Sequence, residues 1–171
     1  GLYQYKSEII KHNKWFVVEG YTDVLSLHQN GIKNTVASSG TALTEGQIKL
    51  ISRFTNTITL LFDGDEAGIK ASLKGVNLIL KNGLNIKVIN FPKGEDPDSF
   101  AKNHGKSMLQ SFLSENEKDF IDFRLNIISD KDKKDPIKRS NLIKELSLSI
   151  SLISDPITRA VYSQDLSKKL E

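Results

Sequence analysis

Six acidic residues in the first 105 positions lie in short turns that contain glycine or proline, whereas solvating acids are usually scattered along helix faces. They are Glu19, Asp23, Asp63, Asp65, Asp96 and Asp98. Carboxylates that lie close together repel one another, and this raises the free energy of ionising them unless a cation lies among them. Oxygen ligands without histidine or cysteine favour Mg²⁺ or Mn²⁺. The chemistry that fits such a site is phosphoryl or nucleotidyl transfer, in which metal ions align the attacking and leaving oxygens.

Four short runs rich in β-branched and aromatic residues have the composition of strands and are bounded by turn-forming residues. They cover residues 15–18, 34–37, 57–62 and 85–91. Amphipathic stretches separate them, so the sequence predicts an α/β fold with a mainly parallel sheet and helices on both faces. Glu19 then follows the first strand, and Asp63 and Asp65 follow the third. Asp96 and Asp98 follow the fourth, so all three turns are expected at the carboxyl edge of the sheet, where open α/β sheets bind ligands.

Helices are expected at residues 2–12, 24–28, 44–54 and 71–80 in the first part of the chain. The third of these opens with Thr44 and has Gln47 three residues later, which is the spacing of a capping box. After Gly105 the sequence shows no further strand, and helices are expected near residues 106–113, 117–128, 136–153 and 156–170. We therefore divide the chain into an α/β domain of residues 1–105 and a small all-helical subdomain of residues 106–171.

The composition narrows the class of protein. Without cysteine, the chain has no disulfide framework, thiolate zinc site or iron–sulfur cluster, and this fits a reducing compartment such as the cytoplasm. No apolar run approaches the roughly 20 residues of a membrane helix, so we expect no membrane among its partners. The net charge of +3 is too small to indicate nucleic-acid binding by itself. Because the chain begins at Gly1 and its only methionine is Met108, we expect a piece of a longer protein.

Four segments together resemble the TOPRIM segment of the bacterial DNA primase family. They are Glu19-Gly20-Tyr21-Thr22-Asp23-Val24, Ser39-Gly40-Thr41-Ala42, Asp63-Gly64-Asp65-Glu66-Ala67-Gly68 and Gly94-Glu95-Asp96-Pro97-Asp98. Other TOPRIM proteins share the Glu-Gly and Asp-x-Asp turns, whereas the Ser-Gly-Thr-Ala and Glu-Asp-Pro-Asp elements are more particular to primases. The resemblance covers residues 1–105, and residues 106–171 resemble more loosely the helical end of the primase polymerase domain.

The resemblance implies a TOPRIM fold and a set of metal ligands that are all carboxylates in acidic turns. The central ligands, which would carry the catalysis, are Glu19, Asp63 and Asp65. Asp96 and Asp98 would help to hold a further metal ion or the nucleotide phosphates. The metal would be Mg²⁺, with Mn²⁺ as a substitute, and zinc is implied only for a module of the family that lies outside this sequence.

Five further residues are expected to contact or shape the nucleotide site. By the motifs of the family, Gly20 and Asp23 would shape the first acidic turn. Gly40 and Thr41 would belong to the loop that faces the nucleotide. Lys93 precedes the last acidic turn, where its ammonium group could meet a nucleotide phosphate.

The implied activity is that of a DNA-directed RNA polymerase that makes short RNA primers for bacterial replication. Its partners would be a single-stranded DNA template, ribonucleoside triphosphates and the RNA primer, at replication forks in the bacterial cytoplasm. The replicative helicase of the primosome would bind through a region outside this sequence. The basic N-terminal half of the polymerase domain also lies outside it, so we expect the isolated chain to be inactive or weakly active.

Several of these residues also have purely structural interpretations. Asp96 precedes Pro97, as Asp135 and Asp155 also precede prolines, and aspartate followed by proline is a common start of a helix. Asp23 could complement a helix dipole in the first helical turn. The turn at residues 63–65 could be a polar turn after a buried strand. Both roles can coexist at one residue.

Two other functions remain open at this stage. The same metal site could serve DNA strand cleavage, as in TOPRIM topoisomerases and nucleases, although none of the four tyrosines lies in a context that supports a nucleophilic role. Alternatively, the isolated chain could be a non-catalytic module whose helical part binds a replication partner.

Overall fold

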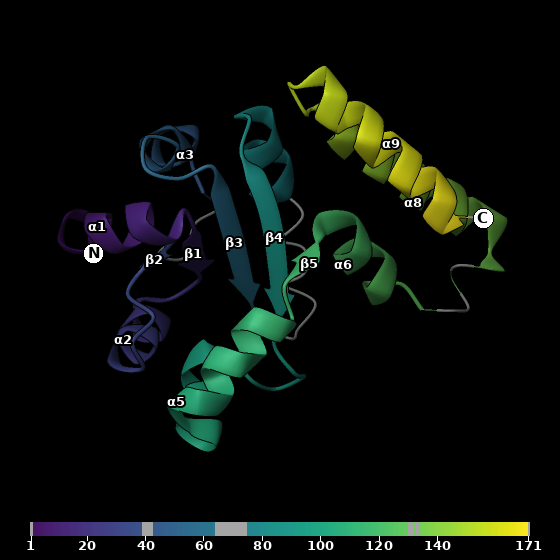
Figure 1. Ribbon diagram of the computed structural model, residues 1–171. Helices are drawn as coiled ribbons and strands as arrows, with labels where there is room; N and C mark the ends of the chain where they lie inside the picture. The colour runs from purple at the N-terminus through teal and green to yellow at the C-terminus, as the bar shows by residue number, and fades with distance from the viewer. Residues whose placement is uncertain (1, 39–42, 64–74, 130–131, 133, 171) are drawn as a thin grey trace.

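The computed structural model describes residues 2–38, 43–63, 75–129, 132 and 134–170. These residues contain a five-stranded sheet in the order β2-β1-β3-β4-β5 (Figure 1). Its strands are β1 (Trp15–Val18), β2 (Thr35–Ala37), β3 (Thr57–Phe62), β4 (Asn85–Asn90) and β5 (Lys118–Asp119). The first four are parallel, and β5 is antiparallel to β4. The predicted mainly parallel sheet is confirmed.

Helices in the described residues connect and follow the strands. They are α1 (Leu2–His12), α2 (Tyr21–Gln29), α3 (Glu45–Ile51), residues 75–81, α5 (Pro97–Glu115), α6 (Phe120–Ile127), α8 (Pro136–Ser151) and α9 (Pro156–Leu170). The predicted helices at residues 2–12 and 156–170 are confirmed at both ends. Within the described ranges, no helix has the length and apolar character needed to cross a membrane.

Both faces of the sheet are buried. On β1, Trp15 and Val17 belong to one cluster of buried side chains, and Phe16 and Val18 belong to the other. The second cluster is completed by α2 and α5, whereas α1, α3, residues 75–81, α6, α8 and α9 contribute to the first. A strand that is buried on both faces has no polar side to its sequence, and this is why β1 is a continuous apolar run.

The capping box at the start of α3 is confirmed. The Thr44 hydroxyl accepts the Gln47 N–H at 3.3 Å, and the Gln47 side-chain oxygen accepts the Thr44 N–H at 2.8 Å. Two backbone donors that a helix leaves unbonded at its first turn are therefore satisfied.

One expectation for the chain after residue 105 is wrong, and another is confirmed. A further strand is present, because β5 pairs Lys118 with Val88 and Asp119 with Lys87 on β4. With two residues, β5 is too short to show a strand pattern in the sequence. The expected helix near residues 106–113 is confirmed. The backbone of Gly105 is non-helical, with φ of 77° and ψ of 175°, and it separates this helix from the one that begins at Pro97, although both lie within the bounds of α5. The division of the chain at residue 105 stays a prediction.

Polar contacts connect the helical part to the edge of the sheet. Arg124 on α6 donates two hydrogen bonds of 2.8 Å to the carboxylate of Glu145 on α8. The Tyr162 hydroxyl on α9 donates to Asp119 on β5 at 2.6 Å. Burial and the neighbouring Asp119 carboxylate raise the pKa of Tyr162, so its hydroxyl stays protonated and keeps donating. Figure 1 shows α8 and α9 side by side beyond the β4–β5 end of the sheet.

Candidate active site

Glu19 and Asp63 lie at the carboxyl ends of two neighbouring strands. β1 and β3 are parallel and pair Val17 with Leu60, so Glu19 lies beside Phe62, the residue before Asp63. From β1 the chain adds β2 on one side of the sheet and β3 on the other. At such a switch point the connections diverge and leave a crevice at the carboxyl ends, where ligands bind. The expectation that these two acidic turns leave the sheet at the same edge is confirmed.

The chemistry of these two side chains fits a hard divalent cation. Both are partly buried carboxylates, and each has a bonding or electrostatic partner in the fold. Oxygen donors of this kind favour Mg²⁺ or Mn²⁺ over softer metals. Among the residues that the structure describes, no group of three or more His, Asp or Glu side chains is arranged to hold a metal ion. The pair therefore needs further ligands, and the sequence predicts Asp65 as one of them.

Three predicted site residues, Gly40, Thr41 and Asp65, lie outside the described residues. Their assigned contacts with the nucleotide and the metal stay predictions.

Asp23 is a buried carboxylate with an exposed fraction of only 6%. Its Oδ2 accepts the Gly20 N–H at 3.0 Å, within the first acidic turn. The backbone N–H of Asp98, in the first turn of α5, also faces this carboxylate and lowers its pKa. Burial raises the pKa of Asp23, and the charges of Asp96 and Asp98 raise it further, whereas the two backbone hydrogen bonds lower it. Asp23 thus joins the N-terminal ends of α2 and α5, while contact of Gly20 or Asp23 with a cofactor stays a prediction.

Asp96 is the N-cap of α5, as the structural interpretation of the sequence had it. Its Oδ1 accepts the Ser99 N–H at 2.6 Å, and the Ser99 hydroxyl oxygen accepts the Asp96 N–H at 2.9 Å. Asp98 forms an ion pair of 2.6 Å with Lys102. The hydrogen bond from Lys102 lowers the pKa of Asp98, and a hydrogen bond from Ser26 on α2 lowers it as well. Binding of a metal ion or of phosphates by Asp96 and Asp98 stays a prediction.

Two further residues lie near the acidic turns, of which Lys93 was predicted from the sequence and Ser26 was not. Lys93 is exposed in the turn that follows β4, and its contact with a phosphate stays a prediction. Ser26 is buried on α2, where its hydroxyl helps to lower the pKa of Asp98, and this role was not predicted from the sequence. No sequence signal marks Ser26, because the contact exists only when α2 packs against α5.

Two protein families match this chain. Residues 16–101 match the Toprim-like family. Residues 121–171 match a family described as the DnaB-helicase binding domain of primase. The first match contains Glu19, Asp63 and the N-terminal end of α5, and the second contains most of α6 and all of α8 and α9.

Curated relatives include bacterial DNA primases. The DNA primase of Clostridium acetobutylicum is 40% identical over 157 residues, which are 90% of this chain and 26% of that protein. The DNA primase of Staphylococcus aureus is 34% identical over 161 residues, which are 94% of this chain and 27% of that protein. The chain therefore spans about a quarter of the length of these relatives.

Solved structures of primases have a similar fold. The Escherichia coli primase catalytic core is 31% identical, with a TM-score of 0.82 over 99% of this chain and 55% of that one. A DnaG primase catalytic domain bound to single-stranded DNA is 30% identical, with a TM-score of 0.81 over 98% of this chain and 55% of that one.

Proposed function

Because this chain belongs to the Toprim-like family and is similar over most of its length to bacterial DNA primases, we propose that it is the metal-binding part of a primase catalytic domain. The parent protein would make short RNA primers for replication by metal-dependent nucleotidyl transfer. The pair of carboxylates at the switch point, Glu19 and Asp63, is the observation that supports this most directly. The expected TOPRIM fold with a following helical part is confirmed by the similarity to the E. coli core.

The residues of the site divide into metal ligands and residues that hold the turn. Glu19, Asp63 and Asp65 would hold Mg²⁺ in the crevice at the switch point. When bound, the metal would supply charge stabilisation for the attacking and leaving oxygens of nucleotidyl transfer. Gly20 and Asp23 hold the turn that carries Glu19, through the hydrogen bond of 3.0 Å between them.

The nucleic-acid and nucleotide partners follow from the relatives. One similar catalytic domain was solved bound to single-stranded DNA, and we extend that binding to the parent of this chain. Ribonucleoside triphosphates would lie at the same edge of the sheet, near Gly40, Thr41 and Lys93. Asp96 and Asp98 would hold a further metal ion or the triphosphate from the N-terminal end of α5.

Binding of Mn²⁺ to this chain tests the metal site without requiring activity. We expect the chain to bind Mn²⁺ and the double variant Asp63→Asn/Asp65→Asn to bind it at least about tenfold more weakly. Loss of a residue that only orients a ligand already lowers metal affinity by about that factor, and loss of the ligand itself should lower it at least as much. Electron paramagnetic resonance measures the free Mn²⁺ during the titration. A matched control is Asp165→Asn, which changes a partly exposed aspartate on α9. Equal affinity in the chain and the double variant would contradict the assignment.

The helices of the second part are a candidate site for the replicative helicase. We expected the helicase to bind outside this sequence, but the match of residues 121–171 to a helicase-binding family supports contact through α6, α8 and α9. On α9, Ile157 and Val161 are one helical turn apart and are exposed by 74% and 59%. Exposed apolar side chains that share a helix face are typical of surfaces that bind other proteins.

Substitutions on α9 test this contact. We expect Ile157→Asp/Val161→Asp to weaken binding of the helicase at least about tenfold, because charges would replace apolar contacts at an interface. Isothermal titration calorimetry with the purified helicase measures the affinity. The control is Ile137→Asp, because Ile137 is equally exposed, at 73%, but lies near the far end of the helix pair, where Arg139 bonds to the Leu170 carbonyl. Unchanged affinity in the double variant would contradict the proposal.

A further inference from the structure

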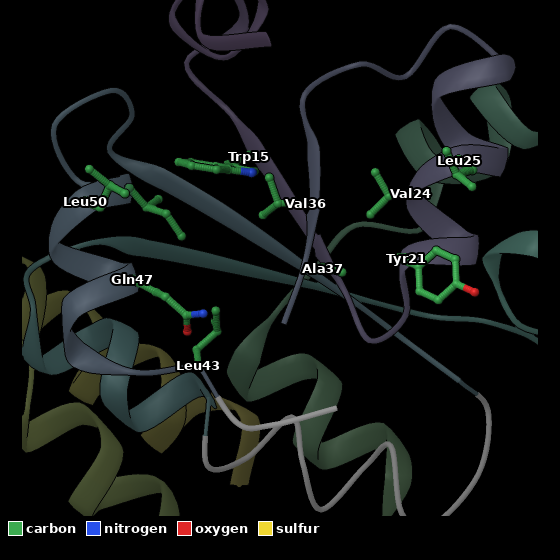
Figure 2. A pocket seen from close by; sticks show the side chains of 10 residues that line it. Trp15, Tyr21, Val24, Leu25, Val36, Ala37, Leu43, Gln47 and Leu50 are labelled. Atoms are coloured by element: carbon green, nitrogen blue, oxygen red, sulfur yellow. The ribbon is translucent and has the colours of Figure 1, made fainter. Parts of the chain in front are cut away.

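An apolar groove of about 410 Å³ runs along β2 at the edge of the sheet (Figure 2). It opens on both faces of the sheet at once. Val36 and Leu50 line it on the side of α3, and Leu25 and Ala37 line it on the side of α2. Because successive residues of a strand point to opposite faces, an added strand would find apolar contacts for its side chains on both sides. A helix would present its apolar residues as a single stripe and would not match this arrangement.

Among the described residues, none pairs through its backbone with the outer edge of β2 at Ala37. Phe16 of β1 donates its N–H to Asn34 at 2.9 Å, and Ser38 donates to Val18 of β1 at 2.9 Å. In a parallel ladder alternate residues bond to the same neighbour, so the N–H and C=O of Ala37 point away from β1. No turn, loop or helix cap in the part of the chain that the structure describes forms a backbone hydrogen bond with Ala37.

Neighbouring positions show that the opening is local. Thr35 lies two residues before Ala37 on the same edge. Its carbonyl oxygen is 3.2 Å from His28 Nε2, so this position already has a hydrogen-bond partner. On the side of α3, Trp15 is buried, and its Nε1 has no hydrogen-bond partner among the described residues. This nitrogen lies at the end of the ring next to Val36 (Figure 2). An occupant that brings an oxygen acceptor into the groove would satisfy this buried donor.

We propose that the groove receives a β-strand from the part of the primase catalytic domain that lies outside this chain. The strand would pair with β2 at Ala37 and place alternate apolar side chains beside Leu25 and Leu50. This chain covers 55% of the E. coli catalytic core, so a large part of such a domain lies outside it. A segment of the same protein has a high effective concentration at the groove, and it protects an apolar edge that otherwise pairs with other chains. The proposal rests on the proposed function only in taking the parent to be a primase.

Hydrogen–deuterium exchange at the Ala37 amide tests the proposal. It is measured in this chain alone and in the full-length protein, without metal, nucleotide or template. We expect exchange at least about tenfold slower in the full-length protein, because pairing protects the amide. In that protein, Leu25→Lys and Leu50→Lys should restore fast exchange. The control Leu148→Lys should leave the exchange slow. Leu148 lies on α8 and is exposed by 59%, which is close to the 57% of Leu25.

Two results would overturn the proposal. Equal exchange at Ala37 in the two proteins would show that no segment of the parent pairs there. Protection that appears in this chain alone and grows with its concentration would assign the groove to a second copy. Thermal unfolding of each variant of this chain checks that the substitutions leave the fold intact. Because the exchange does not depend on Asp63 or on primer synthesis, failure of this proposal and failure of the proposed function are distinguishable.

Discussion

We expect Asp63→Asn in the full-length parent protein to lower the rate of the proposed primer synthesis by about a thousandfold or more. Asparagine has nearly the size of aspartate but carries no charge, so the end of β3 keeps its shape while the site loses an anionic ligand. The measurement is template-dependent incorporation of labelled ribonucleotides on single-stranded DNA with Mg²⁺. The full-length protein is needed because this chain spans about a quarter of its curated relatives, and we expect the chain alone to be inactive or weakly active.

The control for this experiment is Asp165→Asn, which removes a surface carboxylate that pairs with Lys169 at 2.8 Å on α9. It should keep full primer synthesis. Primer synthesis retained by Asp63→Asn, with an unchanged melting temperature, would contradict the proposed function. Nicking of supercoiled DNA by the parent, lost in Asp63→Asn, would instead favour a strand-cleaving TOPRIM enzyme. A parent with neither activity, together with tight binding of the helicase, would favour a non-catalytic module.

The central strands could be predicted from the sequence because they are buried on both faces. A run such as Thr57–Phe62 consists of β-branched and apolar residues and ends at an aspartate, so its composition marks both its type and its limits. Short elements held by tertiary contacts carried no such signal. The two residues of β5 are a strand only because β4 offers its edge to them. The helix break at Gly105 was by contrast predictable, since a glycine at positive φ commonly ends a helix.

The site was predictable to the extent that it follows from strand ends. Glu19 and Asp63 lie where a parallel sheet must place them, because β1 and β3 are neighbours. Asp96 kept both of its interpretations, and the structure confirms its capping role while leaving metal binding as a prediction. The contact of Asp23 with the N-terminal end of α5 was not predictable, because the two groups are brought together only by the packing of α2 on α5.

A partly buried ion pair connects parts of the chain that the sequence gives no reason to join. Lys14, just before β1, donates to both carboxylate oxygens of Glu117 at 2.7 and 2.8 Å. The hydroxyl of Thr59 on β3, which is fully buried, donates to the same carboxylate at 3.0 Å. Among the residues that the structure describes, Glu117 therefore accepts hydrogen bonds from both a charged group and a buried hydroxyl, which come from separate segments. These contacts span 103 and 58 residues of sequence, beyond any local pattern.

Glu117→Leu should lower the free energy of unfolding of this chain by about 2 kcal/mol, because it leaves the Thr59 hydroxyl buried without an acceptor and the Lys14 ammonium without its counter-ion. The value lies at the lower end for such losses, since the Lys14 side chain is 31% exposed and water partly replaces its partner. Urea denaturation followed by circular dichroism measures it.

Glu117→Gln separates the two contributions, because it keeps an oxygen acceptor for Thr59 and loses only the charge. It should therefore cost clearly less than Glu117→Leu. The matched control is Glu45→Gln, which breaks an exposed pair with Lys81 of 3.2 Å and should leave the unfolding midpoint unchanged. If Glu117→Leu also left the midpoint unchanged, the pair would be a surface contact without energetic weight. The attachment of β5 to the sheet would then rest on the buried side chains that follow it, such as Phe120 and Ile121.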